Sequence, residues 1–357
     1  MACWPGREPR MAASNWPARR PLTTDTAGPG PRIVALGGGT GLPVLLGGLK
    51  EALFPRDRRA SARRDRLTAI VTVADDGGSS GRLRETYRML PPGDIRNCLL
   101  ALSSGRSMLA PLFNFRFSGS QDVGGHSLGN LILSALTEIE NDFCEAVEHA
   151  GRLLGICGRI LPATLADVRV TAEFEDGSSV AGESKIAVRR RHIRRVRLHP
   201  AGARVLPEAA AAIEAADVIA IAPGSLYTSL IPILLVEGLV EAMTRARGRV
   251  VLVMNLMTEP GETEAFTAVD HLLAIRRHAP KIRIDDVLLN TTPIAPALLA
   301  RYSAAGAVPI TIDREILQAL GYRPHECDLL RADHQIRHDP GKLAHAVMET
   351  MANREAK

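Results

Sequence analysis

The sequence RIVALGGGTGLPVLLGGLK, residues 32–50, determines how the chain folds. The four apolar residues Ile33–Leu36 predict a buried strand, the glycines after them a tight loop, and Leu42–Leu49 a helix. Strand, glycine loop and helix form the opening unit of nucleotide-binding α/β domains, in which amides at the helix start meet phosphate. Counted from Gly37, Leu42 replaces the third glycine of G-x-G-x-x-G. The pattern therefore predicts a phosphate-binding loop more strongly than a dinucleotide fingerprint.

The alternation of strand and helix recurs along the chain. Further strands are predicted at 67–74, 218–222, 250–254 and 284–289, with helical segments between them. This rhythm predicts an α/β fold with a Rossmann-like, doubly wound, mostly parallel sheet and one crevice at its carboxyl edge. Residues 167–183 alternate and turn at Asp176-Gly177, which predicts a small antiparallel β insertion at about 160–200. We expect residues 31–350 to form a single nucleotide-binding domain and residues 1–30 to be a disordered extension.

Composition excludes several classes of protein. The chain has 357 residues, 46% hydrophobic and 23% charged, as is usual for a globular protein. Its net charge of +5 comes largely from local basic runs at 7–32, 56–66 and 189–197, so no nucleic-acid partner is expected. The run at 189–197 is either a solvated strand face or a contact for an anionic partner. No apolar run is long enough to span a membrane, and residues 1–30 lack the apolar stretch of a secretory signal.

The five cysteines have no metal-ligand spacing, so we interpret them as buried free thiols in a reducing cytoplasm. A cytoplasmic location follows from these features together.

A second polar loop follows the strand predicted at 67–74. Asp75 and Asp76 begin it, and glycines and serines continue it to Gly81. An acidic residue here can hold a ribose hydroxyl, and two carboxylates can hold Mg²⁺. The alternative is that Asp75 caps a helix and Asp76 makes a turn.

Further candidates lie before helices. Asp94 is interpreted as a helix cap, whereas Arg96 and Asn97 open an otherwise apolar segment, and Arg96 can pair with phosphate or carboxylate. His126, among glycines at a helix start, is either a structural histidine or a group that binds phosphate or moves a proton. Asp333, His334, His338 and Asp339 are interpreted as part of a surface tail.

Seven blocks, in order from about residue 31 to about residue 330, resemble the bacterial gluconeogenesis-factor family. They are GGGTGL (37–42), TVADDGGSSGRLR (72–84), PPGDIRNCLLAL (91–102), GHSLGN (125–130), GRILPAT (158–164), PGSLYTS (223–229) and MTEPGET (257–263). The resemblance implies a Rossmann-like core related to 2-phospho-L-lactate transferase, which transfers a phospholactyl group from a guanylyl-activated donor with Mg²⁺. It also implies nucleotide-sugar binding and a requirement for normal cell shape and for growth on gluconeogenic carbon sources.

The resemblance also implies a ligand pocket. Its residues are Gly38, Gly39, Thr40, Gly41, Asp75, Asp76, Asn97, His126, Asn130, Gly224, Ser225 and Asn255. Glycine loops would hold a diphosphate, Asp76 a hydroxyl of ribose or sugar, and asparagines at strand ends the base.

Three functions compete on these residues. The first is a regulator that binds a UDP-sugar or similar nucleotide without turnover, and the second is a phospholactyl transferase with Asp75 and Asp76 on Mg²⁺. The lack of a nucleophile motif or Walker loop counts against a hydrolase or a P-loop NTPase, and the lack of an aromatic-rich acceptor pocket disfavours the transferase, so the balance favours a regulator over an enzyme. An NAD-dependent oxidoreductase is disfavoured because the third glycine is missing. A homo-oligomer is compatible with all three.

Overall fold

The computed structural model describes residues 30–54, 64–104, 108–119 and 122–352. A seven-stranded sheet, parallel at every pair, runs through these residues in the order β10-β9-β8-β7-β1-β2-β3. Its strands are β1 (Ile33–Gly37), β2 (Leu67–Val71), β3 (Arg159–Pro162), β7 (Val218–Ile221), β8 (Arg249–Val253), β9 (Asp286–Asn290) and β10 (Arg323–Cys327). The predicted fold class is confirmed, together with all five predicted strands, while β3 and β10 were not predicted.

β1 is the centre of the sheet. Ile33 pairs with Leu67 of β2 on one side and with Val218 of β7 on the other. All five residues of β1 are buried, as expected for a central parallel strand that is covered on both faces. The chain winds outward from β1 in one direction and from β7 in the other, so the strand order reverses between them. In such sheets ligands bind outside the carboxyl ends at this switch point.

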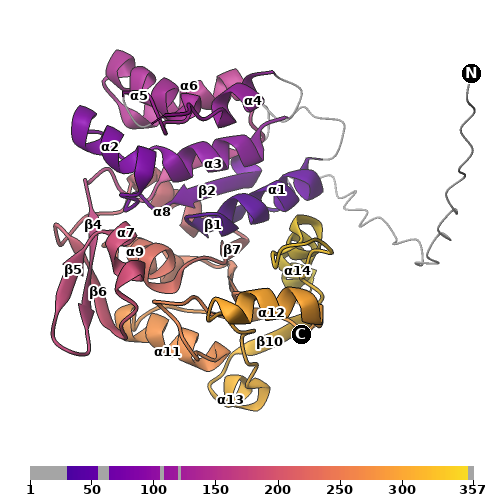
Figure 1. Cartoon of the computed structure of the whole chain (residues 1–357). Helices are drawn as coiled ribbons and strands as arrows, with labels where there is room; N and C mark the ends of the chain where they lie inside the picture. Colours follow the sequence, from indigo (N-terminus) through magenta and orange to yellow (C-terminus); the bar gives the residue numbers. More distant parts are fainter. Residues whose placement is uncertain (1–29, 55–63, 105–107, 120–121, 353–357) are drawn as a thin grey trace, which may run out of the picture. The chain divides into compact units, whose positions relative to one another are not determined.

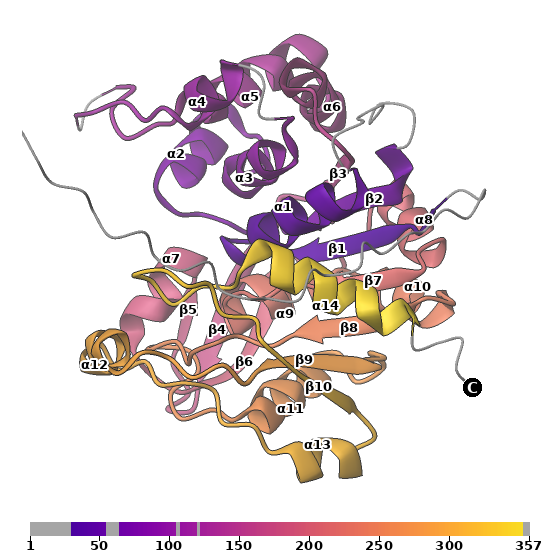
Figure 2. The same ribbon diagram turned by 90° about the vertical axis from the view of Figure 1, so that its right-hand side faces the viewer.

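Helices cover both faces of the sheet. Parallel crossovers are right-handed, and the two halves wind in opposite directions, so their helices fall on opposite faces. In Figure 2, α14 crosses in front of the central strands and packs on α1. The first face carries α1 (Gly41–Leu53), α3 (Gly93–Leu102) and α14 (Pro340–Ala352), and the second α8 (Pro207–Glu214), α9 (Ile231–Leu234), α10 (Leu239–Arg245) and α11 (Ala268–His278).

Four more helices form an outer layer beside α3, seen at the top of Figure 1. They are α2 (Gly78–Tyr87), α4 (Leu109–Asn114), α5 (Leu128–Glu140) and α6 (Phe143–Leu154). Toward the end of the chain lie α12 (Pro296–Ala304) and α13 (Arg314–Ala319).

The predicted glycine loop at 77–81 is wrong, because α2 begins at Gly78. Asp75 Oδ1 accepts a hydrogen bond from the Gly77 amide at 2.8 Å, which turns the chain into the helix. A side chain at Gly81 would come within 2.2 Å of the Asp76 carbonyl oxygen, so glycine allows the first helical turn to close. Ser79 and Ser80 are consequently buried.

The antiparallel insertion consists of β4 (Arg169–Phe174), β5 (Ser179–Ala181) and β6 (Ile193–His199), in the order β5-β4-β6. Its first hairpin turns at Asp176-Gly177 as predicted, with Ser178 N–H bonded to Asp176 Oδ1 at 2.9 Å. The insertion starts later than the predicted residue 160, because β3 belongs to the main sheet. A short helix, α7 (Glu183–Ile186), follows β5.

The basic run forms the exposed side of β6. Arg194, Arg195 and Arg197 are exposed, and both Arg194 and Arg197 form ion pairs with Glu173. Val196 lies on the buried side, and its N–H donates to His278 Nε2 at 3.0 Å, which ties the insertion to α11.

Two findings concern membrane spans and cysteines in the described part of the chain. None of its helices is long and apolar enough to cross a membrane. Cys98, Cys144, Cys157 and Cys327 form no disulfide among these residues, and Cys98 and Cys157 are buried. Residues 1–29, where an extension was predicted, and Cys3 within them lie outside the described residues.

Candidate functional site

Two loops meet at the switch point, one after β1 and one after β7. Gly39 has φ +61°, a left-handed conformation that favours glycine. A Cβ at Gly41 would lie 1.9 Å from the Pro223 carbonyl oxygen, so only glycine allows the start of α1 to approach the second loop. Thr40 is the exposed N-cap of α1, and its side chain does not cap the helix. The first amides of α1 therefore face this edge without a side-chain acceptor.

A cavity of about 470 Å³ opens beside these loops. Four of the predicted site residues line it: Thr40, Gly41, Gly224 and Asn255. The chain after β8, the end of α12 and residues 336–338 complete the wall. They contribute Leu256, Met257, Thr258, Glu259, Pro260, Tyr302, Ala305, Ala307, Ile336, Arg337 and His338. Met257, Ala307 and Ile336 form a small apolar cluster separate from the main core.

Asn255 fixes the second loop. Its Oδ1 accepts from the Gly224 amide at 3.0 Å, and its Nδ2 donates to the Gly224 carbonyl at 2.9 Å. Asn290, at the end of β9, similarly accepts from the Leu329 amide and donates to the Thr292 carbonyl. Both amide side chains thus hold backbone in place at the carboxyl ends of their strands, Asn255 at the cavity, and base contact by them stays a prediction.

His338 was interpreted as part of a surface tail, and that interpretation is wrong for this residue. It is buried, lines the cavity, and its Nε2 lies 3.2 Å from the Met254 carbonyl oxygen, to which it donates. Burial lowers its pKa to about 4, so the ring is neutral at physiological pH. Its Nδ1 is then an acceptor.

Four carboxyl groups gather below the first glycine loop. Asp94 Oδ2 accepts a hydrogen bond from the Gly39 amide at 2.8 Å. Burial, and next the charge of Asp75, raise the pKa of Asp94 to about 6. Asp76 Oδ1 accepts from the Ser184 amide at 2.9 Å, which brings the insertion to this edge. Burial raises the pKa of Glu183 to about 9, with further contributions from the charges of Asp75 and Asp94.

Asp94 and Glu183 were not predicted as site residues. Asp94 was interpreted as a helix cap, but Pro92 is the N-cap of α3 and the carboxylate of Asp94 binds the glycine loop instead. Within the described residues, no group of three or more His, Cys, Asp or Glu side chains is placed to hold a metal ion. Mg²⁺ commonly uses one or two carboxylates and completes its shell with phosphate and water, a donor set that Asp75 and Asp76 fit.

Another pair of carboxyl groups, Glu259 and Glu262, lies next to the loop after β7. Glu262 accepts from the Tyr227 amide at 3.0 Å and from Thr228 Oγ1 at 2.8 Å. Burial, and next the charge of Glu259, raise its pKa to about 7. The hydroxyl of Ser225 donates to Glu259. The predicted site residue Ser225 is therefore engaged in holding the loop.

Three more predicted residues, Asn97, His126 and Asn130, form a third group around the loop before α5, while Gly38 lies in the first glycine loop against Asp94. Ser79 Oγ lies 2.9 Å from His126 Nδ1 and accepts from Asn130 Nδ2 at 2.9 Å. Asn97 Oδ1 accepts from Arg96 Nη2 at 2.7 Å. Asp75 and Asp94 act electrostatically on Arg96, which places this third group next to the carboxyl groups.

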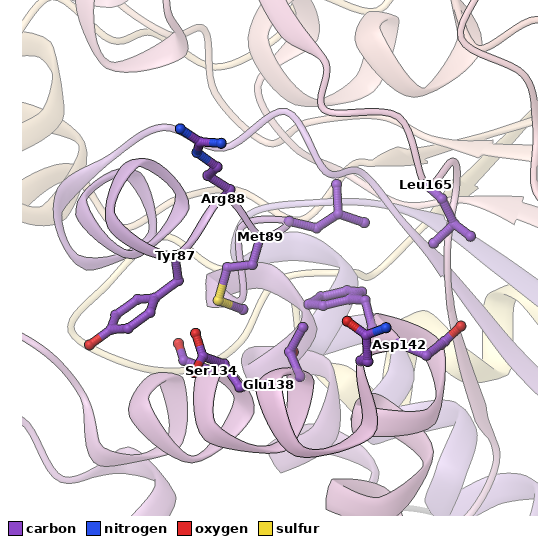
Figure 3. A pocket seen from close by; sticks show the side chains of 11 residues that line it. Tyr87, Arg88, Met89, Ser134, Glu138, Asp142 and Leu165 are labelled. Atoms are coloured by element: carbon purple, nitrogen blue, oxygen red, sulfur yellow. The ribbon is translucent and has the colours of Figure 1, made fainter.

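Another cavity, of about 500 Å³, lies between the end of α2 and the α5–α6 turn. In Figure 3, Tyr87, Arg88 and Met89 stand over Ser134 and Glu138 of α5. None of the twelve predicted site residues lines it, and it lies away from the switch point.

Comparison with known proteins gives consistent matches over most of the chain. The model of the family described as 2-phospho-L-lactate transferase CofD matches residues 33–330. The curated gluconeogenesis factor of Halalkalibacterium halodurans is 43% identical over 318 residues, 89% of this chain and 95% of the relative. That of Bacillus subtilis is 44% identical over 322 residues, 90% of this chain and 98% of the relative. A crystal structure from Bacillus halodurans, described as a upf0052 family member, has a TM-score of 0.83 at 42% identity and covers 89% of this chain and 99% of its own.

Proposed function

The chain belongs to the CofD family, among relatives that are gluconeogenesis factors, and we propose that it binds a nucleoside diphosphate sugar at the switch point of its sheet. In this proposal it acts as a cytoplasmic regulator needed for cell shape and for growth on gluconeogenic carbon sources. The observation that carries the proposal is the 470 Å³ cavity between the carboxyl ends of β1, β7 and β8. Pockets for small ligands have volumes of about 300–1,000 Å³.

The cavity offers suitable side chains or amides for the base and for the diphosphate of such a ligand. The apolar side chains of Met257 and Ile336 suit the flat face of a base, and neutral His338 offers an acceptor. The uncapped amides at the start of α1 suit the diphosphate. Arg337, exposed and on the cavity wall, supplies a cation near it. A uridine nucleotide sugar is the preferred ligand because of the family.

The decisive experiment is calorimetry with a panel of uridine, guanosine and nicotinamide nucleotides, with and without Mg²⁺. Ala305 is exposed and lines the cavity, so Ala305→Trp should block it without disturbing the core. The matched control is Ala304→Trp, an exposed neighbour outside the cavity wall. We expect Ala305→Trp to weaken binding at least tenfold and the control to bind as the wild type. Equal binding by both variants would exclude this cavity.

A transferase is the second candidate. Its support is the CofD match and the charge of Asp75 next to Asp94, which binds the glycine loop; Asp75 and Asp76 would there hold Mg²⁺ together with the phosphates of the donor substrate. Bound Mg²⁺ would supply charge neutralisation at the phosphoryl group. Incubating the folded protein with a guanylyl-phospholactate donor, a deazaflavin acceptor and Mg²⁺ tests it by product formation. Recovery of both substrates unchanged would exclude this transferase reaction and leave nucleotide binding as the proposed function.

A further inference from the structure

Arg96 is a buried arginine without an ion-pair partner. Its exposed fraction is 7%, and none of the described carboxylates pairs with it. Its Nη2 donates to the neutral oxygen of Asn97, and its Nε is buried with no hydrogen-bond partner in the described structure. A buried cation is costly unless hydrogen bonds and opposite charges offset its desolvation, and burial lowers the pKa of Arg96. Arg96 therefore has an unused donor and no direct ion pair, while the charges of Asp94 and Asp75 act on it from nearby.

Two more guanidinium groups stand around the turn before His126. Arg82 Nη2 donates to the Gly124 carbonyl and Arg116 Nη1 to the Gly125 carbonyl, each at 2.6 Å. Both hold the glycine turn before His126, and the charge of Arg116 also acts on Arg96. In the described part of the chain neither Arg82 nor Arg116 forms an ion pair. Arg82 and Arg116 thus place two positive charges beside His126, and Arg116 adds its charge to that of Arg96.

The polar groups on this turn add further hydrogen-bonding capacity. Ser79 Oγ accepts from Asn130 Nδ2, and we assign its own hydrogen to the bond with His126 Nδ1. With this assignment His126 is neutral, in line with its lowered pKa, and carries its proton on Nε2, a donor. Asn130 Oδ1 is a buried acceptor without a partner among the described residues, in a side chain that is 2% exposed. Two buried polar groups, Arg96 Nε and Asn130 Oδ1, are therefore unsatisfied beside the same turn.

We propose that Arg82, Arg96, Arg116 and His126 bind the phosphoryl group of a second small molecule, separate from the nucleotide in the switch-point cavity. Three cations and a neutral imidazole donor suit a dianionic phosphoryl group better than a singly charged carboxylate. The unsatisfied acceptor of Asn130 suits a hydroxyl or amide donor on the same molecule. Asp94 and Arg96 share the first turn of α3, and Asp94 binds Gly39. The phosphoryl group would therefore lie close to the nucleotide's phosphate loop.

The test measures the binding of inorganic phosphate by calorimetry and by the rise in Tm. Acetate, a singly charged carboxylate, is measured in the same way for comparison. Arg96→Met keeps the shape of the side chain but removes its charge, and Arg116→Gln changes an exposed residue that does not endanger the fold. Arg204→Gln removes one positive charge from an exposed site elsewhere and is the matched control. We expect phosphate affinity to fall at least tenfold in Arg96→Met and Arg116→Gln and to be unchanged in the control, with phosphate preferred over acetate.

A competition experiment separates this site from the nucleotide cavity. Phosphate should bind equally well to the wild type and to Ala305→Trp, whose cavity is blocked, and should still bind when a nucleotide saturates the protein. Phosphate binding that is the same in Arg96→Met, Arg116→Gln and Arg204→Gln would overturn the proposal. So would exclusion of phosphate by bound nucleotide. If no nucleotide binds at all, the proposed nucleotide-binding function fails. The phosphate measurements on the arginine variants still test the proposed phosphoryl site.

Discussion

The carboxylate of Asp286 in β9 accepts two hydrogen bonds from the guanidinium of Arg249 in β8, at 2.6 and 2.7 Å. The same carboxylate, which is fully buried, also accepts from His325 Nε2 of β10 at 2.7 Å and from Arg323 at 3.2 Å. Burial alone would raise the pKa of Asp286, but the hydrogen bonds from His325 and Arg249 hold it below its usual value. Three strands are therefore tied together at the edge opposite the crevice.

Asp286→Ala should lower the free energy of unfolding by about 3–5 kcal/mol, the usual effect of leaving a buried charge without its partner. Asp65→Ala is the control, since its pair with Arg32 is half exposed on both sides and contributes at most about 1 kcal/mol. Urea unfolding of both variants measures the difference. A loss of the same size in both would show that the Asp286 cluster adds nothing special.

Two glycines of α1 should respond oppositely to alanine. A Cβ at Gly41 would meet the Pro223 carbonyl oxygen at 1.9 Å, whereas one at Gly47 would meet nothing within 4 Å. Gly41→Ala should therefore destabilise the protein and weaken nucleotide binding, because the two loops at the switch point must separate. Gly47→Ala should stabilise it by up to about 1 kcal/mol through helix propensity. Thermal unfolding with and without nucleotide distinguishes the two.

The Glu183 carboxyl should make stability fall as the pH rises. Its folded pKa of about 9 lies above its unfolded value near 4.5, so the native state binds the extra proton between these limits. The contribution of Glu183 to the free energy of unfolding is then greatest at low pH and is lost as the pH rises from about 4.5 to about 9. Glu183→Gln should have a higher Tm than the wild type at pH 8 and a similar one at pH 4.5. Glu138→Gln, an exposed carboxyl on α5, should match the wild type at both.

The titration of His278 should make stability fall as the pH drops, opposite to the effect of Glu183. It accepts the Val196 N–H at Nε2 and donates from Nδ1 to the Ala274 carbonyl, so it must stay neutral. Burial, then the charges of Arg195 and Arg277, lower its pKa below 6.5. The unfolded chain therefore binds more protons below about pH 6.5, and stability falls as the pH drops through that range.

Amide hydrogen exchange of β6 at pH 7 and pH 5 tests this. We expect faster exchange of residues 193–199 at pH 5 in the wild type, beyond the intrinsic change with pH. His278→Gln keeps a side-chain acceptor but cannot titrate, so the additional change should disappear. In His345→Gln, a half-exposed site on α14, it should persist. An identical pH response in both variants would contradict the role of His278.

How far the sequence predicts this molecule depends on where the interactions lie. Continuous apolar runs identified β1, β2, β7, β8 and β9, because central parallel strands are buried on both faces. β3 and β10 contain Arg, Pro or His in four or five residues and lie at the two edges of the sheet, so their apolar signal is weak.

The site was predicted only in part for a related reason. Loops that follow strands were identified by their glycines and carboxylates, and four of their residues line the switch-point cavity. Asp94 reads locally as a helix cap, since its partner, Gly39, is 55 residues away. His338 meets the Met254 carbonyl across 84 residues. Neither contact leaves a local pattern, because both arise only when the sheet is assembled.

The position of β1 has a consequence for synthesis on the ribosome. Arg32 and Asp217, which flank the pairing of β1 with β7, are 185 residues apart. At translation rates of about 5–20 residues per second, β7 leaves the ribosome roughly 10–40 s after β1. During that interval one side of β1 presents open hydrogen-bonding groups and apolar surface. A nascent chain arrested before residue 217 should therefore bind chaperones more strongly than one released after β8.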